Sequence, residues 1–519
     1  MKKLLSILAT LFSIFTSARA DVTVSAVFGD NMVLQRDQEN QVWGQAESGE
    51  KVTVTIAGQT HDTLAGKSKR WQVTLKPIKA TANPLTLTIK GNNTLKFENV
   101  LVGEVWVCSG QSNMGWSVSQ TDDSDLEILT ANYPNLRLIS IPQLGTQEAQ
   151  FSFKGKWEAA TTETVPTFSA VGYLFGRRLH QTLNVPVGLI DNAWGGSACE
   201  AWIPRKLLNE TAVAKPYMEQ WRMTEANYDA KAVQAQFEGR KAKWLEAAKK
   251  AKAAGRPAPR APRQPRNPLA GQHRPANLFN GVLNPIIGYG IRGAVWYQGE
   301  SNSGRAHAYR EVFPLMIGTW RKYWNQGDFS FYWVQLADFL AEDAEPLDSN
   351  WAELREAQTL SLDKLDKVGQ AVIIDVGEGR DIHPRNKQIV ANRLARLALA
   401  KDYGLDLPHL SPRYKSHEAK NGKITVSFDH VGGGLYAFDE REPVGFAVCG
   451  EDKKYVWAKA RIAGKDKVEV WADSVKNPVH VRYAWANNPV CNLYRRDGAV
   501  TLPATPFRTD DFPMLTHGK

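Results

Sequence analysis

Val105-Trp-Val-Cys-Ser-Gly-Gln-Ser-Asn-Met114 is the stretch from which we infer the fold. Its first three residues form a short apolar β run that breaks at Ser109-Gly110, and Ser112 follows where the backbone turns toward a helix. A serine at the C-terminal edge of a parallel sheet can present its hydroxyl beside backbone N–H groups that stabilise an oxyanion. Met114 replaces the second glycine of G-x-S-x-G, which argues against an α/β-hydrolase elbow. The alternative is an ordinary turn whose serine caps a helix.

Three other polar turns bring further candidate groups. Ser112, Asp381 and His383 occur in the order serine, acid, base, and the last two lie two residues apart on one loop. This spacing allows the carboxylate and the imidazole to reach the sheet edge that carries the serine. The three turns are Asn192-Ala-Trp-Gly-Gly-Ser197, Val295-Trp-Tyr-Gln-Gly-Glu-Ser-Asn302 and Asp381-Ile-His-Pro384.

Together these turns resemble the motifs of the SGNH (GDSL-like) hydrolases, and more narrowly those of the sialate O-acetylesterase family of carbohydrate acetylesterases. The resemblance also covers Phe28-Gly-Asp-Asn-Met-Val-Leu-Gln-Arg36 and Val481-Arg-Tyr-Ala-Trp-Ala-Asn-Asn-Pro489, and so runs over nearly the whole mature chain. It implies a serine esterase that removes O-acetyl groups from a sugar through an acetyl-enzyme intermediate. The related sequences commonly have a glutamate after Gln-Ser-Asn-Met, where this chain has Gly115.

A serine hydroxyl is a poor nucleophile unless a base activates it. Among ten histidines, His383 is the best placed, because it follows an acid by two residues on a loop after a buried strand. We therefore expect Ser112 to be the nucleophile, His383 the base and Asp381 the acid that orients the imidazole. Many SGNH enzymes separate acid and base by one more residue, so Asp375 and Glu378 are alternatives for the acid. A helix cap beside a surface histidine is the structural alternative.

The acyl-transfer intermediate carries negative charge on the former carbonyl oxygen, and N–H groups aimed at that position stabilise it. Counting the serine turn as the first, the second turn is Asn192–Ser197. Its two glycines let the backbone approach a substrate closely, although both could serve that turn alone. We expect Glu300 to organise the third turn (Val295–Asn302) rather than to perform chemistry. The candidate donors are the N–H of Ser112, the N–H of Gly195 or Gly196, and the side-chain amide of Gln298 or Asn302.

Aromatic residues cluster around the expected turns, and the C–H faces of a sugar ring stack on aromatic rings. Packing beside the sheet edge is the alternative for each of them. Two arginines could contact substrate hydroxyls or a carboxylate, or could lie on the surface. The expected substrate-binding residues are Trp116, Trp194, Trp296, Arg274 and Arg305.

The formal charge of +10 is unevenly distributed. Between Gln234 and Arg266, ten Lys or Arg occur with two Glu, and residues 1–20 carry three more cationic side chains, so the rest of the chain has a formal charge of −1. We therefore expect no nucleic-acid partner. No C-x-x-C or H-E-x-x-H spacing predicts a zinc site, and we expect neither metal nor cofactor. Of four cysteines, Cys449 and Cys491 could form a disulfide in an oxidising compartment.

Hydrophobic periodicity predicts the organisation of the chain. Residues 1–20 combine a basic start, an apolar run and a small-x-small site, so we expect a secretory signal peptide cleaved after Ala20, a periplasmic or secreted protein, and no membrane span. The remainder is expected to comprise an N-terminal β-sandwich-like domain (21–99), a three-layer α/β catalytic domain (100–410) and a C-terminal β domain (411–519). The family resemblance implies that the catalytic domain has the SGNH-hydrolase (flavodoxin-like) fold.

Within the expected catalytic domain, the apolar spacing predicts particular elements. We expect a helix over 169–183, a helix over 315–324 that begins after Pro314, a strand over 371–375 and a helix over 388–400. An insert over about 210–272 is predicted to form a helical hairpin with inward aromatic residues, followed by a Pro/Arg-rich extended loop. This insert is either a solvated basic surface or a lid that shapes substrate choice.

The resemblance suggests sialic acid O-acetyl esters as the substrate. Acetylated plant cell-wall polysaccharide, such as xyloglucan or xylan, is the second possibility, because similar sequences act on both. A rival of another class is a carbohydrate-binding protein with an inactive site. The complete set of triad candidates argues against that rival. The oligomeric state does not follow from the sequence.

Overall fold

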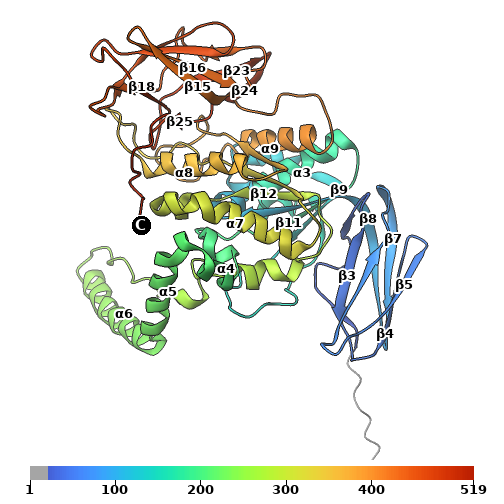
Figure 1. Cartoon of the computed structure of the whole chain (residues 1–519). Coiled ribbons are helices and arrows are strands. Elements are labelled where there is room, and N and C mark those ends of the chain that lie inside the picture. The colour runs from blue at the N-terminus through green and yellow to red at the C-terminus, as the bar shows by residue number, and fades with distance from the viewer. Residues whose placement is uncertain (1–20, 519) are drawn as a thin grey trace, which may run out of the picture.

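The computed structural model describes residues 21–518. The expected signal peptide, residues 1–20, lies outside the described residues. Over the described range, no helix combines the length and the apolar character needed to cross a membrane. Mixed α/β structure occupies the middle of the chain, and strands dominate both ends (Figure 1).

A mostly parallel sheet forms the centre of the molecule. Its strand order is β10-β9-β11-β8-β12-β13-β14, and only β10 at one edge runs antiparallel to its neighbour. Parallel strands in this arrangement bring their C-terminal ends to one edge, where ligands usually bind. The strands are β8 (Thr94–Gly110), β9 (Asn132–Ser140), β10 (Glu158–Thr161), β11 (Val187–Asp191), β12 (Gly293–Tyr297), β13 (Ser330–Val334) and β14 (Val368–Ala371).

Helices cover both faces of this sheet, which explains the continuous apolar runs of its strands. Val105 and Val107 of β8 belong to the core that contains α7 and α8, whereas Trp106 and Cys108 belong to the core that contains α3 and α9. Successive side chains of a strand point to opposite faces, so each of these four residues is buried. The covering helices are α3 (Ala170–Leu183), α7 (Ala306–Trp324), α8 (Asn350–Leu360) and α9 (Lys387–Lys401).

Strand β8 connects the central sheet to the N-terminal strands. Its first part pairs with β7 (Thr81–Lys90) and β2 (Val33–Gln35), and its second part pairs with β11 and β12. The expected boundary at residue 99 therefore falls inside one continuous strand. The other N-terminal strands are β1 (Thr23–Val24), β3 (Asn40–Gln45), β4 (Lys51–Ile56), β5 (Gln59–Leu64) and β6 (Arg70–Leu75).

The C-terminal strands form three smaller sheets around their own hydrophobic core. Their orders are β15-β16-β21-β20, β17-β23-β24 and β19-β18-β22-β25. The bounds are β15 (Arg413–Lys420), β16 (Lys423–Asp429), β17 (Leu435–Ala437), β18 (Phe446–Cys449), β19 (Val456–Trp457), β20 (Lys459–Ile462), β21 (Lys467–Trp471), β22 (His480–Tyr483), β23 (Leu493–Asp497), β24 (Val500–Pro503) and β25 (Phe507–Arg508).

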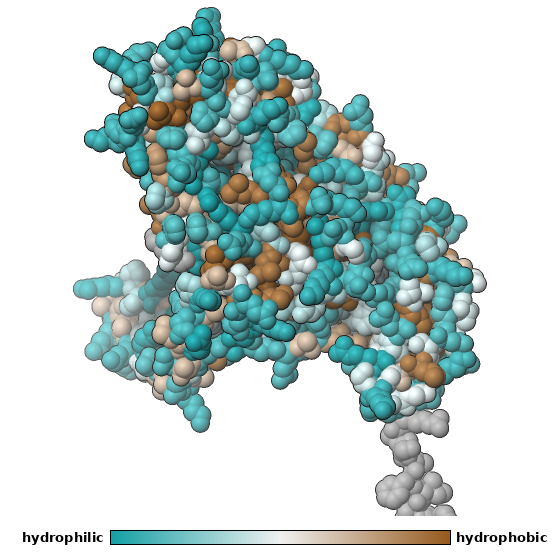
Figure 2. Space-filling view, viewed as in Figure 1, coloured by the Kyte–Doolittle hydropathy of each residue, from teal (hydrophilic) through white to brown (hydrophobic). Residues whose placement is uncertain are grey.

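The insert consists of three helices, α4 (Arg205–Glu210), α5 (Lys215–Asn227) and α6 (Ala230–Ala253), followed by an extended segment. Helix α5 packs on the body through Trp221, whereas α6 projects outward and buries only Phe237 (Figure 1). Trp244 of α6 donates a hydrogen bond to the carbonyl of Pro259 at 2.7 Å, which ties the extended segment to the helix. Figure 2 shows hydrophilic side chains along the outer side of this part.

Two predicted elements differ from the structure. Helix α7 begins at Ala306 and contains Pro314 in its interior, because the carbonyl of Arg310, which proline cannot bond, accepts from Lys364 Nζ at 2.7 Å. The strand predicted over 371–375 is instead β14, which ends at Ala371. The apolar side chains of Val372 and Ile374 pack into the C-terminal core rather than continuing the sheet.

The disulfide allowed by the sequence is also absent, since all four cysteines are free thiols. Burial raises the pKa of both the Cys449 and the Cys491 thiol.

Two short helices complete the description of the body. Helix α1 (Ser112–Gly115) follows β8 directly, and α2 (Ser124–Leu129) lies shortly after it.

Candidate active site

The turn between β8 and α1 places Ser112 at the C-terminal edge of the central sheet. Gly110 ends the strand with a φ of +133°, and a Cβ built there would lie 2.2 Å from the carbonyl oxygen of Tyr297. Only glycine fits this close approach of two strands. The next residue, Gln111, donates its N–H to the same carbonyl at 2.9 Å, and Ser112 begins the helix.

The loop before α9 brings an imidazole to this serine across 271 residues of sequence. Ser112 Oγ lies 2.8 Å from His383 Nε2, and His383 Nδ1 lies 3.3 Å from Asp381 Oδ1. The same carboxylate oxygen accepts the backbone N–H of His383 at 2.9 Å. The three predicted side chains therefore stand in series, with the carboxylate 54% exposed and the imidazole 24% exposed.

The two alternative acids have other partners. Asp375 accepts two hydrogen bonds from the guanidinium of Arg393, at 2.6 and 2.7 Å. Glu378 accepts from the backbone N–H and the side chain of Arg385. Asp381 is therefore the carboxylate that the structure brings to the imidazole.

Trp116 covers the other side of the histidine. Its ring stacks on the His383 ring with centroids 4.5 Å apart and planes inclined by 12°. Burial lowers the pKa of His383 below its ordinary value of 6.5, and the hydrogen bond to Asp381 partly opposes this shift. The imidazole is consequently neutral at neutral pH, which is the state that can accept a proton from the serine.

A second polar chain, which sequence reasoning missed, runs through Asn113. Its Nδ2 donates to Glu300 Oε1 at 2.7 Å and to the carbonyl of Ile382 at 3.0 Å, and its Oδ1 accepts from Lys387 Nζ at 2.6 Å. Asn113 thus ties the serine turn both to the third turn and to the histidine loop. Only the adjacency of Asn113 to Ser112 in the sequence could have indicated this role.

Burial shifts both charged ends of this chain toward neutrality. The pKa of Lys387 is lowered from 10.5 to about 7, and the pKa of the buried Glu300 carboxyl is raised. Glu300 Oε2 is buried and has no hydrogen-bond partner among residues 21–518. Glu300 therefore lies next to the serine turn but does not contact His383 through a hydrogen bond.

The second turn lies directly against the serine. Trp194 donates its N–H to the carbonyl of Gly110 at 3.0 Å, and a Cβ on Gly195 would lie 3.4 Å from Ser112 Cβ. In residues 21–518 the N–H groups of Ser112, Gly195 and Gly196 donate to no protein acceptor. These N–H groups are therefore available to a ligand beside the serine hydroxyl.

The two predicted oxyanion amides are engaged elsewhere. Gln298 uses both amide hydrogens, donating to the carbonyl of Ser197 at 3.0 Å and to Asn302 Oδ1 at 2.8 Å. Asn302 is 1% exposed and donates to Glu200 at 3.0 Å. These bonds hold both amides within the third turn, and their role as oxyanion donors stays a prediction.

Gln111 is an amide that sequence reasoning overlooked. Its Oε1 accepts from the N–H of Ser301 at 3.3 Å, so the third turn fixes the side chain beside Ser112. Gln111 is 3% exposed, and within the described part of the chain its Nε2 makes no hydrogen bond.

Three of the five predicted substrate-binding residues have structural partners instead. Trp296 is fully buried among Trp202, Trp320 and Phe331, because it faces the core side of β12. Arg274 pairs with Glu225 of α5 at 2.8 Å. Arg305 pairs with the buried Glu200 at 3.3 Å and lies over the Tyr217 ring at 4.3 Å. Trp116 and Trp194 are half-buried beside the serine turn.

Comparison with known proteins identifies the family. No protein-family model matches the chain. The sialate O-acetylesterase of Mus musculus is 30% identical, with 93% of each chain covered, and that of Rattus norvegicus is 29% identical, with 95% of this chain and 94% of the rat chain covered. The chain belongs to the sialate O-acetylesterase family.

A solved relative agrees with this assignment. The crystal structure of a carbohydrate acetylesterase from Xanthomonas citri is 34% identical and has a TM-score of 0.77, covering 95% of this chain and all of the other. This member of the sialate O-acetylesterase family is accordingly a carboxylic ester hydrolase. Among residues 21–518, no group of three or more His, Cys, Asp or Glu side chains is placed to hold a metal ion.

Proposed function

We propose that the protein removes O-acetyl groups from sugars, with Ser112, His383 and Asp381 as a catalytic triad. The observation that carries the proposal is the 2.8 Å separation of Ser112 Oγ and His383 Nε2, with a carboxylate on the far side of the imidazole. The family membership supports the reaction class. The central sheet with helices on both faces supports assignment to the three-layer SGNH-hydrolase fold.

The first half-reaction forms an acetyl-enzyme. Ser112 Oγ attacks the acetyl carbonyl carbon while its proton moves to His383 Nε2, and Asp381 stabilises the resulting imidazolium. The tetrahedral intermediate then collapses, the bond to the sugar oxygen breaks, and that oxygen takes the proton from His383. In the second half-reaction, water loses a proton to His383 and attacks the acetyl carbonyl, which releases acetate and restores the Ser112 hydroxyl.

We assign the oxyanion site to N–H groups that remain available beside the serine. These are the backbone groups of Ser112 and of Gly195 or Gly196, with Gln111 Nε2 as the side-chain donor in place of Gln298 or Asn302. Each such donor contributes about 2.7–4 kcal/mol to lowering the barrier. The placement of Gln111 is supported by the bond that holds its oxygen to Ser301.

The chain through Asn113 is a positioning device rather than part of the reaction. Asn113 contacts the carbonyl of Ile382, which lies between the acid and the base. A shift of this loop would separate His383 from Ser112, and misplacement by about 1 Å can cost about a hundredfold in rate.

The proposed substrate is an O-acetylated sialic acid, by analogy with the curated relatives. Acetylated xyloglucan or xylan is the second candidate, since the Xanthomonas citri relative is described as a carbohydrate acetylesterase. We also propose that residues 1–20 are a signal peptide and that the mature protein is periplasmic or secreted, starting at Asp21, the first residue that the structure describes.

The decisive experiment compares acetate release by the wild type and Ser112→Ala. The variant should lose roughly a millionfold in kcat on a small acetyl ester, as expected for removal of a triad nucleophile. Measurements of kcat/KM on acetylated sialic acid, xylan and xyloglucan would then rank the substrates. Equal inactivity of both proteins together with retained sugar binding would favour a non-catalytic carbohydrate-binding protein.

A further inference from the structure

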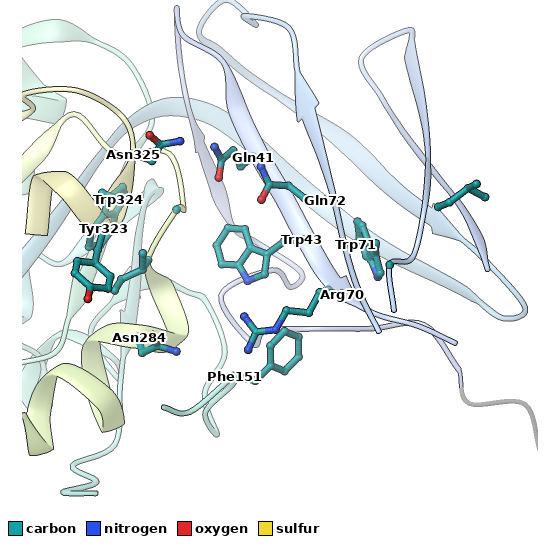
Figure 3. Close-up of a pocket in the computed structure, with 15 residues that line it drawn as sticks. Gln41, Trp43, Arg70, Trp71, Gln72, Phe151, Asn284, Tyr323, Trp324 and Asn325 are labelled. Carbon is teal, nitrogen blue, oxygen red and sulfur yellow. The ribbon is translucent and has the colours of Figure 1, made fainter. Parts of the chain in front are cut away.

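A second pocket lies between the N-terminal strands and the body of the molecule, away from the serine turn (Figure 3). Its volume is about 550 Å³. One wall comes from β3 and β6, which contribute Gln41, Trp43 and Gln72, and the opposite wall comes from the end of α7, which contributes Tyr323 and Asn325.

Helix α7 separates this pocket from the candidate active site. The helix begins at Ala306, directly after Arg305 of the third turn, and its 19 residues end at Trp324. At 1.5 Å per residue, this helix spans roughly 28 Å. The pocket is therefore remote from Ser112, and none of its lining residues takes part in the proposed reaction.

Two aromatic rings line the pocket in fixed orientations. Trp43 is half-buried and meets the ring of Phe28 edge-on, with centroids 4.6 Å apart and planes at 76°. Tyr323 is 45% exposed and meets Phe279 in the same way at 5.0 Å. Accessible aromatic rings fixed by such contacts offer a platform on which the C–H face of a pyranose stacks.

Planar amides accompany these rings. In the part of the chain that the structure describes, the side-chain amides of Gln41, Gln72 and Asn325 make no hydrogen bond to protein. An amide carries both donors and an acceptor, and so matches a sugar hydroxyl, which is also both. Arg70 lies at the same wall, and its guanidinium has no ion-pair partner among the described residues.

Gly288 keeps the space between the walls open. Its φ is +92°, and a Cβ there would lie 3.2 Å from Gln41 Oε1 and 3.8 Å from the ring of Trp43. A side chain at this position would fill the space in front of the indole.

We propose that this pocket binds a neutral pyranose unit of a glycan chain, and so tethers a polysaccharide to the enzyme independently of ester cleavage. Aromatic faces recognise the faces of a sugar ring, and the unbonded amides beside them recognise its hydroxyls. We expect a neutral sugar because three amides and a single cation, Arg70, line the pocket. The proposal concerns polymer binding and does not depend on the identity of the triad.

The test uses affinity electrophoresis of the full mature chain in gels that contain alkali-deacetylated xyloglucan or xylan. At least one of these polymers should retard the wild type, and Tyr323→Ala and Gln72→Ala should each weaken binding about tenfold. Both substitutions replace exposed side chains. The matched control Phe438→Ala, at an aromatic residue that is 50% exposed and lies directly after β17, should bind as the wild type does.

Hydrolysis of a small acetyl ester is measured on the same preparations and should be equal in all four proteins. A wild type without that activity would contradict the proposed function. The polymer-binding result would still test the tether. Failure of both neutral polymers to retard the wild type overturns the tether, as does equal binding by Tyr323→Ala and Phe438→Ala. Retention of the wild type only by an immobilised sialic acid would also overturn it, because the occupant would then be anionic.

Discussion

Two polar chains connect the serine turn to the loop before α9, and they differ in burial and in geometry. The outer chain, Ser112–His383–Asp381, is partly exposed and ends in a 3.3 Å contact to a carboxylate that is 54% exposed. The inner chain, Lys387–Asn113–Glu300, lies deeper, with Lys387 and Asn113 buried and Glu300 half-buried, and its bonds measure 2.6 and 2.7 Å. The groups proposed to react with substrate therefore remain accessible, while more deeply placed groups beside them fix their positions.

The largest expected difference between the chains comes from the acid. Asp381→Asn should lower kcat by about 10⁴-fold, because an amide can neither select the Nδ1–H tautomer nor stabilise the imidazolium. Stopped-flow and steady-state assays on a small acetyl ester would measure this loss. Asp375→Asn is not a neutral control, because that side chain pairs with Arg393, so the exposed Asp439→Asn serves instead. A drop below tenfold would mean that Asp381 is not the acid.

A smaller effect is expected from breaking the inner chain. Asn113→Ala should lower kcat by about a hundredfold with little change in KM, since the histidine loop loses its anchor while the binding surface remains. The matched control is Asn386→Ala, which removes the cap that accepts from the N–H of Ile389 at the start of α9. That variant should lose about 1 kcal/mol of stability but keep its kcat. Equal kcat values for the two variants would remove the positioning role of Asn113.

The pH profile separates the chains further. Because burial lowers the pKa of His383, the acid limb of kcat/KM should have its midpoint below pH 6.5. Trp116→Ala uncovers the imidazole and should move this midpoint upward toward 6.5, as desolvation of the charged form decreases. A wild-type midpoint above 6.5, or an unchanged midpoint in the variant, would contradict the assignment.

The smallest expected effect concerns stability. The pKa of Lys387 is about 7 in the folded chain against an ordinary 10.5, so between these values the unfolded chain binds more protons, and the cost of this group to folding decreases as the pH rises. The charges of Glu300, Glu378 and Asp381 oppose this shift, because they raise the pKa of the Lys387 amine. Lys387→Met removes the titration, so the Tm of the wild type relative to the variant should increase between pH 7 and pH 9 in scanning calorimetry. A constant difference would show that Lys387 does not titrate in this range.

Local patterns predicted much of the scaffold. The helix predicted over 169–183 is α3, and the helix predicted over 388–400 is α9, which extends one residue further at each end. Two predicted elements, the start of α7 and the end of β14, were wrong because a segment distant in the sequence supplies a hydrogen bond or a packing surface there. Lys364 allows α7 to continue past Pro314, and the C-terminal core takes over the apolar residues after Ala371.

The site shows the same division. Ser112, Asp381 and His383 could be named from residue type, order and turn context, and the structure brings them together. The oxyanion amides could not be named in the same way. Gln298 and Asn302 occupy a polar turn in the sequence, but their amides bond within the interior of that turn. Trp296 differs from Trp116 only in the face of the fold that it occupies, which the aromatic content of a turn does not reveal.

The sequence by itself indicated the three side chains that the structure brings together, the family and the alternation of strands and helices, because these follow from residue chemistry and short-range periodicity. Only the tertiary structure decided which polar groups are free to meet a substrate, since that depends on hydrogen-bond partners that lie a hundred or more residues away. It also formed the junction pocket from β3, β6 and the end of α7, whose residues are separated by more than 200 positions and share no local motif.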